Sequence, residues 1–488
     1  MVDSPLEAMY KRLPSRDSRE DQGFSSLSVS LDPLVEVSAV SPPWHLSLPH
    51  VAVALLSAVL YGYHMGVVNA PLQVMAADLG FLQNTLAQGS VVSICLFGAF
   101  FGCAASGNLA DSIGRRRAFQ LSTIPMFLGS CASATASDLR MMIFGRLLVG
   151  LGLGISGPVT ALYITEISPT AVRGTYGSLG QIATCIGILG ALVAGLPVAT
   201  IPGWWRKCFW LSTVPALFLA FGMEFCSESP RWLFKRSRLT DAEREIEKLW
   251  GGAYVKIALS ELIRSESHEE DEQATFKELL TDRYRKVVVI GAALFAFQQL
   301  AGINAVFYFS STVFRNAGIA SDLVASVSVG IVNLFASCVA ACLMDRQGRR
   351  KLLIWSFTGM FAALVSQAFV GSISAFSSMQ GVVSLLGTLM YVLSFALGVG
   401  PVPALLLPEI FPNRIRAKAM AVSMCVHWIT NCLVGLLFLH LLQQLGAPSL
   451  YAFFALVCLL AVVFVKRNVM ETKGKSLEEI ETALLSGK

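Results

Sequence analysis

The chain has 488 residues, of which 54% are hydrophobic and 14% are charged, whereas an average soluble protein carries about 25% charged residues. Because the shortfall is spread along the whole sequence, the composition indicates a polytopic membrane protein and excludes a soluble domain with a single anchor. The net charge of +5 is small for this length and gives no reason to expect a nucleic-acid partner. The eleven cysteines show no CxxC pair and no metal-ligand spacing, so we expect neither a metal nor a cofactor.

Residues 1–47 form a polar, Ser-rich segment of mixed charge, which predicts a disordered N-terminal tail. The tail has no apolar run of the kind that a secretory signal requires. It also carries seven acidic residues between Asp3 and Glu36, whereas organelle transit peptides are poor in acids. The tail composition therefore argues against a cleaved transit peptide.

Apolar runs long enough to cross a bilayer, about 20 residues each, recur twelve times after this tail. A first group of six forms an expected N-terminal bundle over residues 48–226, and the remaining six form a C-terminal bundle over residues 287–467. A hydrophilic segment with short helices, 227–286, connects the bundles, and 468–488 forms a second tail. The expected spans are 51–74, 88–110, 118–137, 141–165, 175–199, 205–226, 287–314, 321–344, 352–372, 380–407, 417–440 and 448–466.

Basic residues cluster after the even-numbered spans and are scarce after the odd-numbered ones. Because positive residues stay on the cytoplasmic side, we expect both tails and the connecting segment to be cytoplasmic. The agreement across six loops also supports an all-α membrane protein with twelve spans. The clusters are Arg115–Arg117, Arg173, Arg231 with Lys235 and Arg236, Arg346 with Arg349–Lys351, Arg414–Lys418, and Lys466 with Arg467.

Span four contains a glycine-rich pattern, Gly150-x-Gly152-x-Gly154-x-x-Gly157. It looks like a dinucleotide fingerprint, but that motif follows a strand and opens a helix. Here the glycines lie inside an apolar span. We therefore expect them to serve close helix packing.

Two sequence elements recur in the same order, which indicates that the two halves are homologous. Asp111-Ser-Ile-Gly-Arg115-Arg-Arg after span two matches Asp345-Arg-Gln-Gly-Arg349-Arg-Lys after span eight, at an offset of 234. Glu166 with Arg173 after span four matches Glu409 with Arg416 after span ten, with 243 residues between the two glutamates. Two parallel halves with a site at their interface are a transporter design.

The charges in this repeat have two interpretations. The arginines are accounted for by topology alone, but topology does not need acids at repeated positions. We therefore expect the charges to form ion pairs between the bundles, which part when the cytoplasmic side opens. The expected gate residues are Asp111, Arg115, Arg116, Glu166, Arg173, Asp345, Arg349, Arg350, Glu409 and Arg416.

Four polar residues lie near the middle of the seventh span: Gln298, Gln299, Asn304 and Tyr308. Buried polar groups without partners cost about 1–3 kcal/mol each, so uncharged amides at this depth suit a guest that is rich in hydroxyls. At about 100° per residue, the four cover more than half of the helix circumference. Either the helix is interrupted near Gly302, where glycine tolerates unusual dihedrals, or one of the four faces a neighbouring helix.

Span ten is expected to break in a similar way, because Gly398-x-Gly400-Pro401-x-Pro403 lies inside it and each proline removes a backbone donor. Interrupted helices at the membrane midplane are common in transporters.

Several motifs, in a fixed order, carry a resemblance to a known family. They are the two charged boxes, Gly145-Arg146, Arg173-Gly174, Ser227-Glu-Ser-Pro-Arg-Trp-Leu233, Gln298-Gln299-x-x-Gly302-Ile-Asn304, the span-ten pattern, and Glu471-Thr-Lys-Gly-Lys-Ser-Leu477. From Leu48 to Glu481 the chain resembles the sugar porter branch of the major facilitator superfamily. Within this branch, Gly62–Asn69 and Pro403–Glu409 are most similar to the plant plastidic glucose transporter group. The resemblance implies a hexose substrate, with glucose first, and a lipid bilayer as surroundings.

The resemblance also implies which residues hold the sugar. Side chains that contact the substrate in family members are retained here, and Tyr308 joins them through its place on span seven. Each amide offers two donors and an acceptor to sugar hydroxyls, and the indole can lie against the apolar face of a pyranose. Interhelical hydrogen bonding for Gln181 and Asn333, and simple packing for Trp428, are the alternatives. The expected set is Gln181, Gln298, Gln299, Asn304, Tyr308, Asn333 and Trp428.

His64 departs from the proton-coupled members of the family, which carry Asp at this position. Histidine can titrate near neutral pH, so His64 is a candidate proton or pH-sensing site. The missing carboxylate nevertheless favours facilitated diffusion by alternating access over proton symport.

The sequence is also consistent with two other functions. A polyol or pentose carrier is the nearest alternative, and a non-transporting sugar receptor is a more distant one. We expect no enzyme, because no nucleophile–base pair, metal cluster or phosphate loop is recognisable. The monomer is the expected functional unit. The resemblance suggests the plastid envelope, and the acidic tail leaves the Golgi or plasma membrane as alternatives.

Overall fold

The structure is a computed structural model that describes residues 42–169, 172–269, 275–319, 321–373, 380–412, 414–473 and 479. Residues 1–41 of the expected N-terminal tail, and most of the expected C-terminal tail, lie outside this description, as do the side chains of 264–269 and of Asp345. All regular structure in the described ranges is helical, which confirms the all-α prediction.

The first half of the chain forms a bundle of membrane-length helices. A short helix, α4 (Leu72–Asp78), follows the first of them, and side-chain caps start two others: Asn84 Oδ1 accepts the Ala87 N–H, and Asp138 Oδ1 accepts the Met141 N–H. The long helices are α3 (Trp44–Gly66), α5 (Thr85–Ile113), α6 (Arg115–Ala134), α7 (Leu139–Ile167), α8 (Arg173–Ala194) and the consecutive pair α9 (Trp204–Leu211) and α10 (Thr213–Gly222).

Three helices lie between the bundles in the sequence: α11 (Pro230–Lys235), α12 (Leu239–Trp250) and α13 (Val255–Glu269). Two tryptophans attach this segment to the first bundle. Trp232 Nε1 donates to the Asp111 carbonyl, and Trp250 Nε1 donates to the Ile167 carbonyl, each at 2.9 Å. The segment is therefore held against the ends of α5 and α7.

The second half forms a second bundle, in which two spans are broken. Its helices are α14 (Asp282–Leu300), α15 (Ile303–Asn316), α16 (Asp322–Gln347), α17 (Arg349–Ser372), α18 (Gln380–Leu397), α19 (Val402–Ile410) and α20 (Arg416–Asn468). α14 and α15 are the two parts of the predicted span seven, and α18 and α19 are the two parts of span ten.

The predicted number of twelve crossings agrees with these helices. Ten helical stretches in the described residues are long and apolar enough to cross a membrane. One of them is α20, whose 53 residues would extend about 80 Å at 1.5 Å per residue, more than twice the bilayer core of about 30 Å. It turns at Gly446, which has non-helical dihedrals, and so crosses twice. The twelfth crossing is α6, which begins with three arginines and packs against α7.

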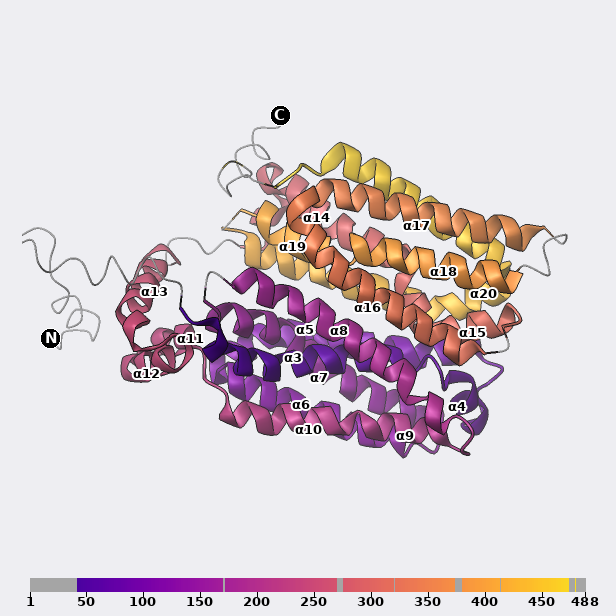
Figure 1. Ribbon diagram of the computed structural model, residues 1–488, viewed down its shortest axis with the longest axis horizontal. Coiled ribbons are helices and arrows are strands. Elements are labelled where there is room, and N and C mark those ends of the chain that lie inside the picture. The colour runs from indigo at the N-terminus through magenta and orange to yellow at the C-terminus, as the bar shows by residue number, and fades with distance from the viewer. Residues whose placement is uncertain are drawn as a thin grey trace, which may run out of the picture.

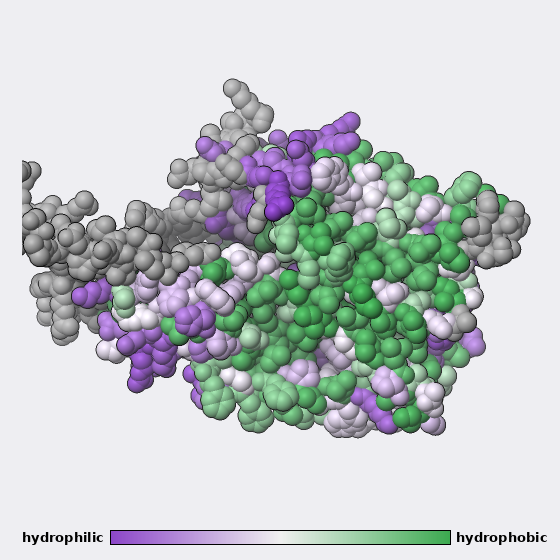
Figure 2. Space-filling model, viewed as in Figure 1, coloured by the Kyte–Doolittle hydropathy of each residue, from purple (hydrophilic) through white to green (hydrophobic). Residues whose placement is uncertain are grey.

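Figure 1 shows the two bundles side by side, with α11–α13 beyond one end of the helices. At this end of the molecule α5 connects to α6 and α16 connects to α17. Because the repeated charged residues lie at these connections, we call it the charged end, and we call the other end the opposite end. Figure 2 shows a hydrophobic surface across the bundles and hydrophilic residues around the charged end. Large apolar side chains such as Phe144, Phe218 and Phe335 are more than half exposed, as suits contact with lipid.

Glycines bring α7 into direct contact with α5. A Cβ atom on Gly150 would overlap the Cys95 carbonyl oxygen, and one on Gly154 would overlap that of Ala99. The expected role in close packing is therefore confirmed for these two glycines. Gly157, in contrast, has no neighbour within 4 Å.

Candidate functional site

The break between α14 and α15 lies at Gly302, as one of the two sequence alternatives predicts. Gly302 has φ 90°, a left-handed conformation that a residue with a Cβ adopts only with strain. Its amide bonds to the Gln299 carbonyl at 3.0 Å, so the chain turns tightly before α15 begins. Because the helix is interrupted, side chains on both sides of the break can face the same region.

Span ten also breaks as predicted, between Leu397 and Val402. The Val399 amide, which the helix leaves without a partner, donates to Ser356 Oγ at 2.9 Å. The carbonyl groups at the break accept hydrogen bonds from span seven. Gln298 Nε2 donates to Val399 O at 2.7 Å and to Gly400 O at 3.0 Å. Gln298 therefore joins the two breaks, and both N–H donors of its amide are occupied.

Gln299 is the centre of an amide cluster beside this junction. Its Nε2 donates to Gln298 Oε1 at 3.1 Å and lies 3.0 Å from His427 Nδ1, and its Oε1 accepts from Asn304 Nδ2. Both glutamines thus use their donors inside the protein. Asn304 differs, because its carbonyl oxygen and one of its two N–H groups take no part in the described hydrogen bonds. Asn304 is the amide of this cluster that is best placed to accept a new partner.

Trp428 and Tyr308 lie on either side of a second group of polar residues. The Trp428 ring is 6.1 Å from that of Tyr61 and 5.2 Å from that of His427, in edge-on contacts. Tyr308 OH donates to Asn431 Oδ1 at 3.2 Å. The Asn431 Nδ2 donor is buried without a partner among the described residues, and the indole N–H of Trp428 faces the Cys103 thiol.

Gln181 and Asn333 meet across the boundary between the bundles. Gln181 on α8 donates to Cys185 Sγ at 3.7 Å, and Asn333 on α16 donates to the same sulfur at 3.2 Å. Ser337 Oγ lies 3.2 Å from this sulfur as well. α8 and α16 therefore share a polar contact in the middle of the membrane, and the Asn333 carbonyl oxygen has no described partner.

His64 lies on α3 beside Arg146 of α7, and both are buried. Arg146 Nη2 donates to the His64 carbonyl at 3.0 Å, and Arg146 Nε donates to the Val91 carbonyl at 3.2 Å. Neither ring nitrogen of His64 has a partner among the described residues. A fixed positive charge therefore lies next to the histidine.

Asn69 joins the bundles at the opposite end. Its Nδ2 donates to the Phe307 carbonyl at 2.7 Å and to Ser310 Oγ at 2.8 Å, and its Oδ1 accepts the Ser311 N–H at 3.0 Å. Arg315 adds a bond to Gln73 at 2.8 Å. The cross-bundle hydrogen bonds of the described residues thus lie in the middle and at the opposite end of the molecule.

The repeated charges pair within each bundle. Arg115 donates to both oxygens of Glu166 at 2.8 and 2.9 Å and to Asp111 Oδ1 at 3.1 Å, so it joins the ends of α5, α6 and α7. In the other half, Arg349 Nη2 donates to Glu409 Oε1 at 3.0 Å. The two-pronged contact of Arg115 with Glu166 is strong and directional and holds the ends of α6 and α7 together, whereas the single bond of Arg349 to Glu409 joins α17 and α19.

The expectation that these charges pair between the bundles is therefore wrong for this conformation. Each acid lies at the end of a helix that packs beside the helix of its base, so the shortest contacts are inside one half. The other predicted gate residues also bond locally: Arg116 donates to the Glu224 carbonyl and Arg350 to the Lys466 carbonyl, each at 2.7 Å, and Arg416 donates to the Phe411 carbonyl at 3.2 Å. Arg173 is exposed at the start of α8.

Two further glutamates complete the charged end, and the sequence analysis did not assign them a role. Glu228 accepts the backbone N–H groups of Arg115 and Arg116 at 3.0 and 3.2 Å. Glu471 accepts those of Arg349 and Arg350 at 2.8 and 3.1 Å. The two glutamates are 243 residues apart, the same offset as Glu166 and Glu409. This offset is the signal that could have identified them.

Each of these glutamates caps the first turn of a helix whose N-terminal amides need acceptors. Burial raises the pKa of Glu228, and the N–H groups of Ser229, Arg115 and Arg116 act against this shift because they stabilise the ionised carboxylate.

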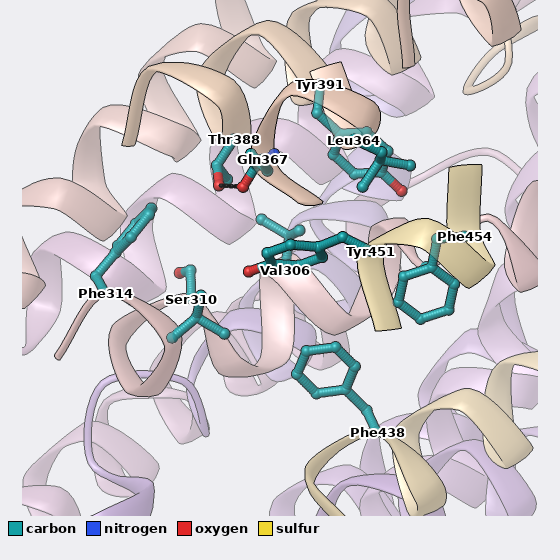
Figure 3. A pocket seen from close by; sticks show the side chains of 12 residues that line it. Val306, Ser310, Phe314, Leu364, Gln367, Thr388, Tyr391, Phe438, Tyr451 and Phe454 are labelled. Atoms are coloured by element: carbon teal, nitrogen blue, oxygen red, sulfur yellow. Dashed lines mark hydrogen bonds between the residues drawn. The ribbon is translucent and has the colours of Figure 1, made fainter. Parts of the chain in front are cut away.

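A cavity inside the second bundle lies behind α15. Val306, Ser310 and Val313 line it from α15, on the face opposite to that of Asn304 and Tyr308. Figure 3 shows Gln367 and Thr388 at its edge, joined by a hydrogen bond of 3.4 Å, and Tyr451 across it. The cavity has room for about two water molecules, so α15 is loosely packed on the side away from the amide cluster.

The family model described as "Sugar (and other) transporter" matches residues 50–484. The chain is 55% identical over 487 residues to a protein named "Probable plastidic glucose transporter 2" from Arabidopsis thaliana, covering 98% of each chain. It is 51% identical over 440 residues to "Plastidic glucose transporter 4" from the same plant, covering 90% of this chain and 81% of the relative.

A solved structure is also similar along most of its length. It is described as the major facilitator superfamily proton:xylose symporter XylE bound to 6-bromo-6-deoxy-D-glucose. The match has a TM-score of 0.75 and 28% sequence identity, and it covers 90% of this chain and 99% of that one.

Proposed function

The chain belongs to the sugar transporter family of the major facilitator superfamily, and we propose that it carries a hexose, glucose first, by facilitated diffusion. It is a multi-pass membrane carrier and not an enzyme. The observation that carries the proposal is the buried cluster of uncharged amides where two broken helices meet. Such a cluster offers hydrogen bonds to a neutral polyhydroxylated molecule and no charge to hold an ionic one.

Asn304 makes the first contact with the sugar in this proposal, because its amide has unused hydrogen-bonding groups. Gln298 and Gln299 then exchange bonds with the backbone and with each other for bonds to the sugar. Trp428 supplies an apolar surface for the C–H face of the ring. Gln181 and Asn333 approach from the boundary of α8 and α16, so sugar binding draws the two bundles toward each other.

The distribution of contacts between the bundles supports alternating access. The Asn69 and Arg315 contacts keep the opposite end closed, while the described charge pairs of the charged end stay within their own bundles. The positive-inside rule assigns the charged end to the cytoplasm. With the charged end in the cytoplasm, the structure corresponds to a carrier that is closed at its opposite end, on the non-cytoplasmic side of the membrane.

Facilitated diffusion is supported by the surroundings of His64. Binding of a proton there would put a second positive charge next to Arg146 in a buried space, and like charges at short distance oppose each other. The carboxylate that proton-coupled members carry would instead gain from the guanidinium when ionised. His64 is therefore a poor replacement for that carboxylate as a site for proton binding.

Proton symport is the second candidate, because the solved relative is described as a proton:xylose symporter. The test uses purified protein in liposomes that contain a pH-sensitive dye. Addition of glucose is expected to leave the internal pH unchanged. Glucose-induced proton uptake that disappears in His64→Ala would reject facilitated diffusion in favour of symport.

The substrate range is tested by competition. Unlabelled glucose is expected to inhibit uptake of labelled glucose more strongly than xylose or a linear polyol does. Stronger inhibition by a pentose or a polyol would assign the carrier to that substrate instead. A sugar receptor without transport would bind glucose and show no flux.

The plastid envelope is the proposed location, supported by the names of the two plant relatives. Expression of the full chain with a C-terminal fluorescent tag tests this proposal in plant cells. Fluorescence around chloroplasts is expected. Fluorescence in the Golgi or at the plasma membrane would favour the alternatives that the acidic N-terminal tail suggests.

A further inference from the structure

A small cavity lies between the two bundles beside His64. α3, α5 and α7 line it from the first bundle, and α15 and α20 line it from the second. Its polar and aromatic members are Tyr61, His64, Arg146, Tyr308 and Trp428. It has space for about one water-sized sphere. The cavity is separate from the one behind α15, which lies wholly within the second bundle.

Nitrogen atoms without a hydrogen-bond partner belong to two residues that line this cavity. In the described part of the chain, both ring nitrogens of His64 and Nη1 of Arg146 are buried without such a partner, whereas the indole N–H of Trp428 faces the Cys103 thiol. The arginine nitrogen is a donor only, and one histidine nitrogen carries a proton in either neutral tautomer. The cavity therefore offers an excess of donors.

Arg146 adds a positive charge to these donors. Its other nitrogens bond to the carbonyls of Val91 and His64, and its guanidinium carbon lies 6.0 Å from the centre of the Phe209 ring. These groups carry no negative charge. No described ion pair gives Arg146 a carboxylate partner. A buried ion without a counter-charge is strongly unfavourable, so something must compensate it.

We propose that this cavity binds a small monovalent inorganic anion, of which chloride is the physiological example. The anion accepts hydrogen bonds from Arg146 Nη1 and from the His64 N–H, and it neutralises the guanidinium. A water molecule would satisfy the donors but leave the charge uncompensated. The flexible side chain of Met65 lines the cavity and lets it adjust to the larger radius of chloride.

The anion supplies the counter-charge that no described carboxylate gives to Arg146. Because Tyr308 and Trp428 line the cavity from the second bundle, the bound anion lies between the two halves. Binding at this site does not depend on which sugar the protein carries, so it can be measured without sugar.

The test measures binding of radioactive chloride to the purified full-length protein by scintillation proximity. Saturable binding is expected, displaced by bromide and not by the larger divalent sulfate. Because Arg146→Gln removes two backbone hydrogen bonds and risks unfolding, the main variant is His64→Asp, which supplies Arg146 with a carboxylate. Chloride binding is expected to be lost in His64→Asp, with an unchanged size-exclusion profile as proof of folding.

Arg206→Gln is the matched control. Arg206 also donates to two backbone carbonyls, those of Ala134 and Ala136, and stacks on Trp205, but it lies outside the cavity. Its variant is expected to bind chloride as the wild type does. The proposal is overturned if the wild type shows no saturable chloride binding, or if His64→Asp binds chloride with unchanged affinity.

Discussion

Asn304 differs from the two glutamines before it because its amide has hydrogen-bonding groups to spare. Gln298 and Gln299 are occupied by Val399, Gly400 and His427. A sugar that binds here must therefore displace existing hydrogen bonds of the glutamines, at a cost, but it can add bonds to Asn304 directly. Because Asn304 has these unused hydrogen-bonding groups, we predict that it makes a large contribution to sugar affinity.

Replacement of Asn304 by alanine is expected to weaken glucose binding while the protein still folds and inserts. Loss of hydrogen bonds in a buried site costs about 1–3 kcal/mol, which raises the KM of transport about 5- to 150-fold. The measurement is the concentration dependence of labelled glucose uptake in vesicles. Asn316→Ala, at the exposed end of the same helix, is the control and should leave KM unchanged. Normal transport by Asn304→Ala would mean that the site is assigned to the wrong residues.

Residue types were easier to predict from the sequence than their partners. The amides of span seven can be recognised in the sequence as polar residues inside an apolar run, and the structure brings three of them together. His427 and Asn431 were missed, because a polar residue on span eleven acquires a role only when that helix packs against span seven. The contact of Gln181 and Asn333 through Cys185 is likewise a product of tertiary packing, which no local pattern encodes.

At the scale of elements, the two broken helices fix the site. Both breaks were predictable, because the causes are local: a glycine at positive φ in span seven, and glycine with proline in span ten. Their mutual contact was not, because it depends on Gln298 reaching carbonyls about a hundred residues away in the chain.

Gly302→Ala is expected to destabilise the protein. The left-handed backbone costs a non-glycine residue about 1–3 kcal/mol, and the added Cβ would lie 2.7 Å from a ring carbon of Phe454. The melting temperature in detergent should fall. Gly190→Ala on α8 is the matched control, because no atom lies within 4 Å of its Cβ position, and alanine is the better helix former by about 0.5–1 kcal/mol. Equal melting temperatures for wild type and Gly302→Ala would show that the break tolerates a side chain.

Glu228→Ala and Glu471→Ala are expected to have similar effects, because the two glutamates cap α6 and α17 in the same way. Glu228→Ala leaves three backbone N–H groups without their acceptor and Glu471→Ala leaves four, two of them in the first turn of the capped helix in each case. We expect each change to cost about 1–3 kcal/mol of stability. The effects should add in the double variant, since the two sites lie in separate bundles. Thermal unfolding measures this, with the exposed Glu243→Ala of α12 as the control. A large effect at only one of the two positions would contradict the symmetry of the halves.

At the scale of the whole molecule, two similar bundles meet beside the proposed sugar site, to which the second bundle contributes the amide cluster and the first bundle contributes Gln181. The repeat and the number of crossings could be predicted, because hydropathy and basic clusters report topology directly. The pairing of the gate charges could not, because spacing along the chain does not distinguish a partner within a bundle from one across the interface. In the structure, Arg115 pairs with Glu166 inside the first half and Arg349 pairs with Glu409 inside the second.

Flux of labelled glucose through the purified protein in liposomes is the most direct test of facilitated hexose transport. We predict saturable uptake that stops when the internal and external glucose concentrations are equal. An imposed pH gradient should change neither the final level nor the direction of net flux. Uptake no faster than in protein-free liposomes would contradict the carrier function. Accumulation of glucose above the external concentration, driven by the pH gradient, would contradict facilitated diffusion.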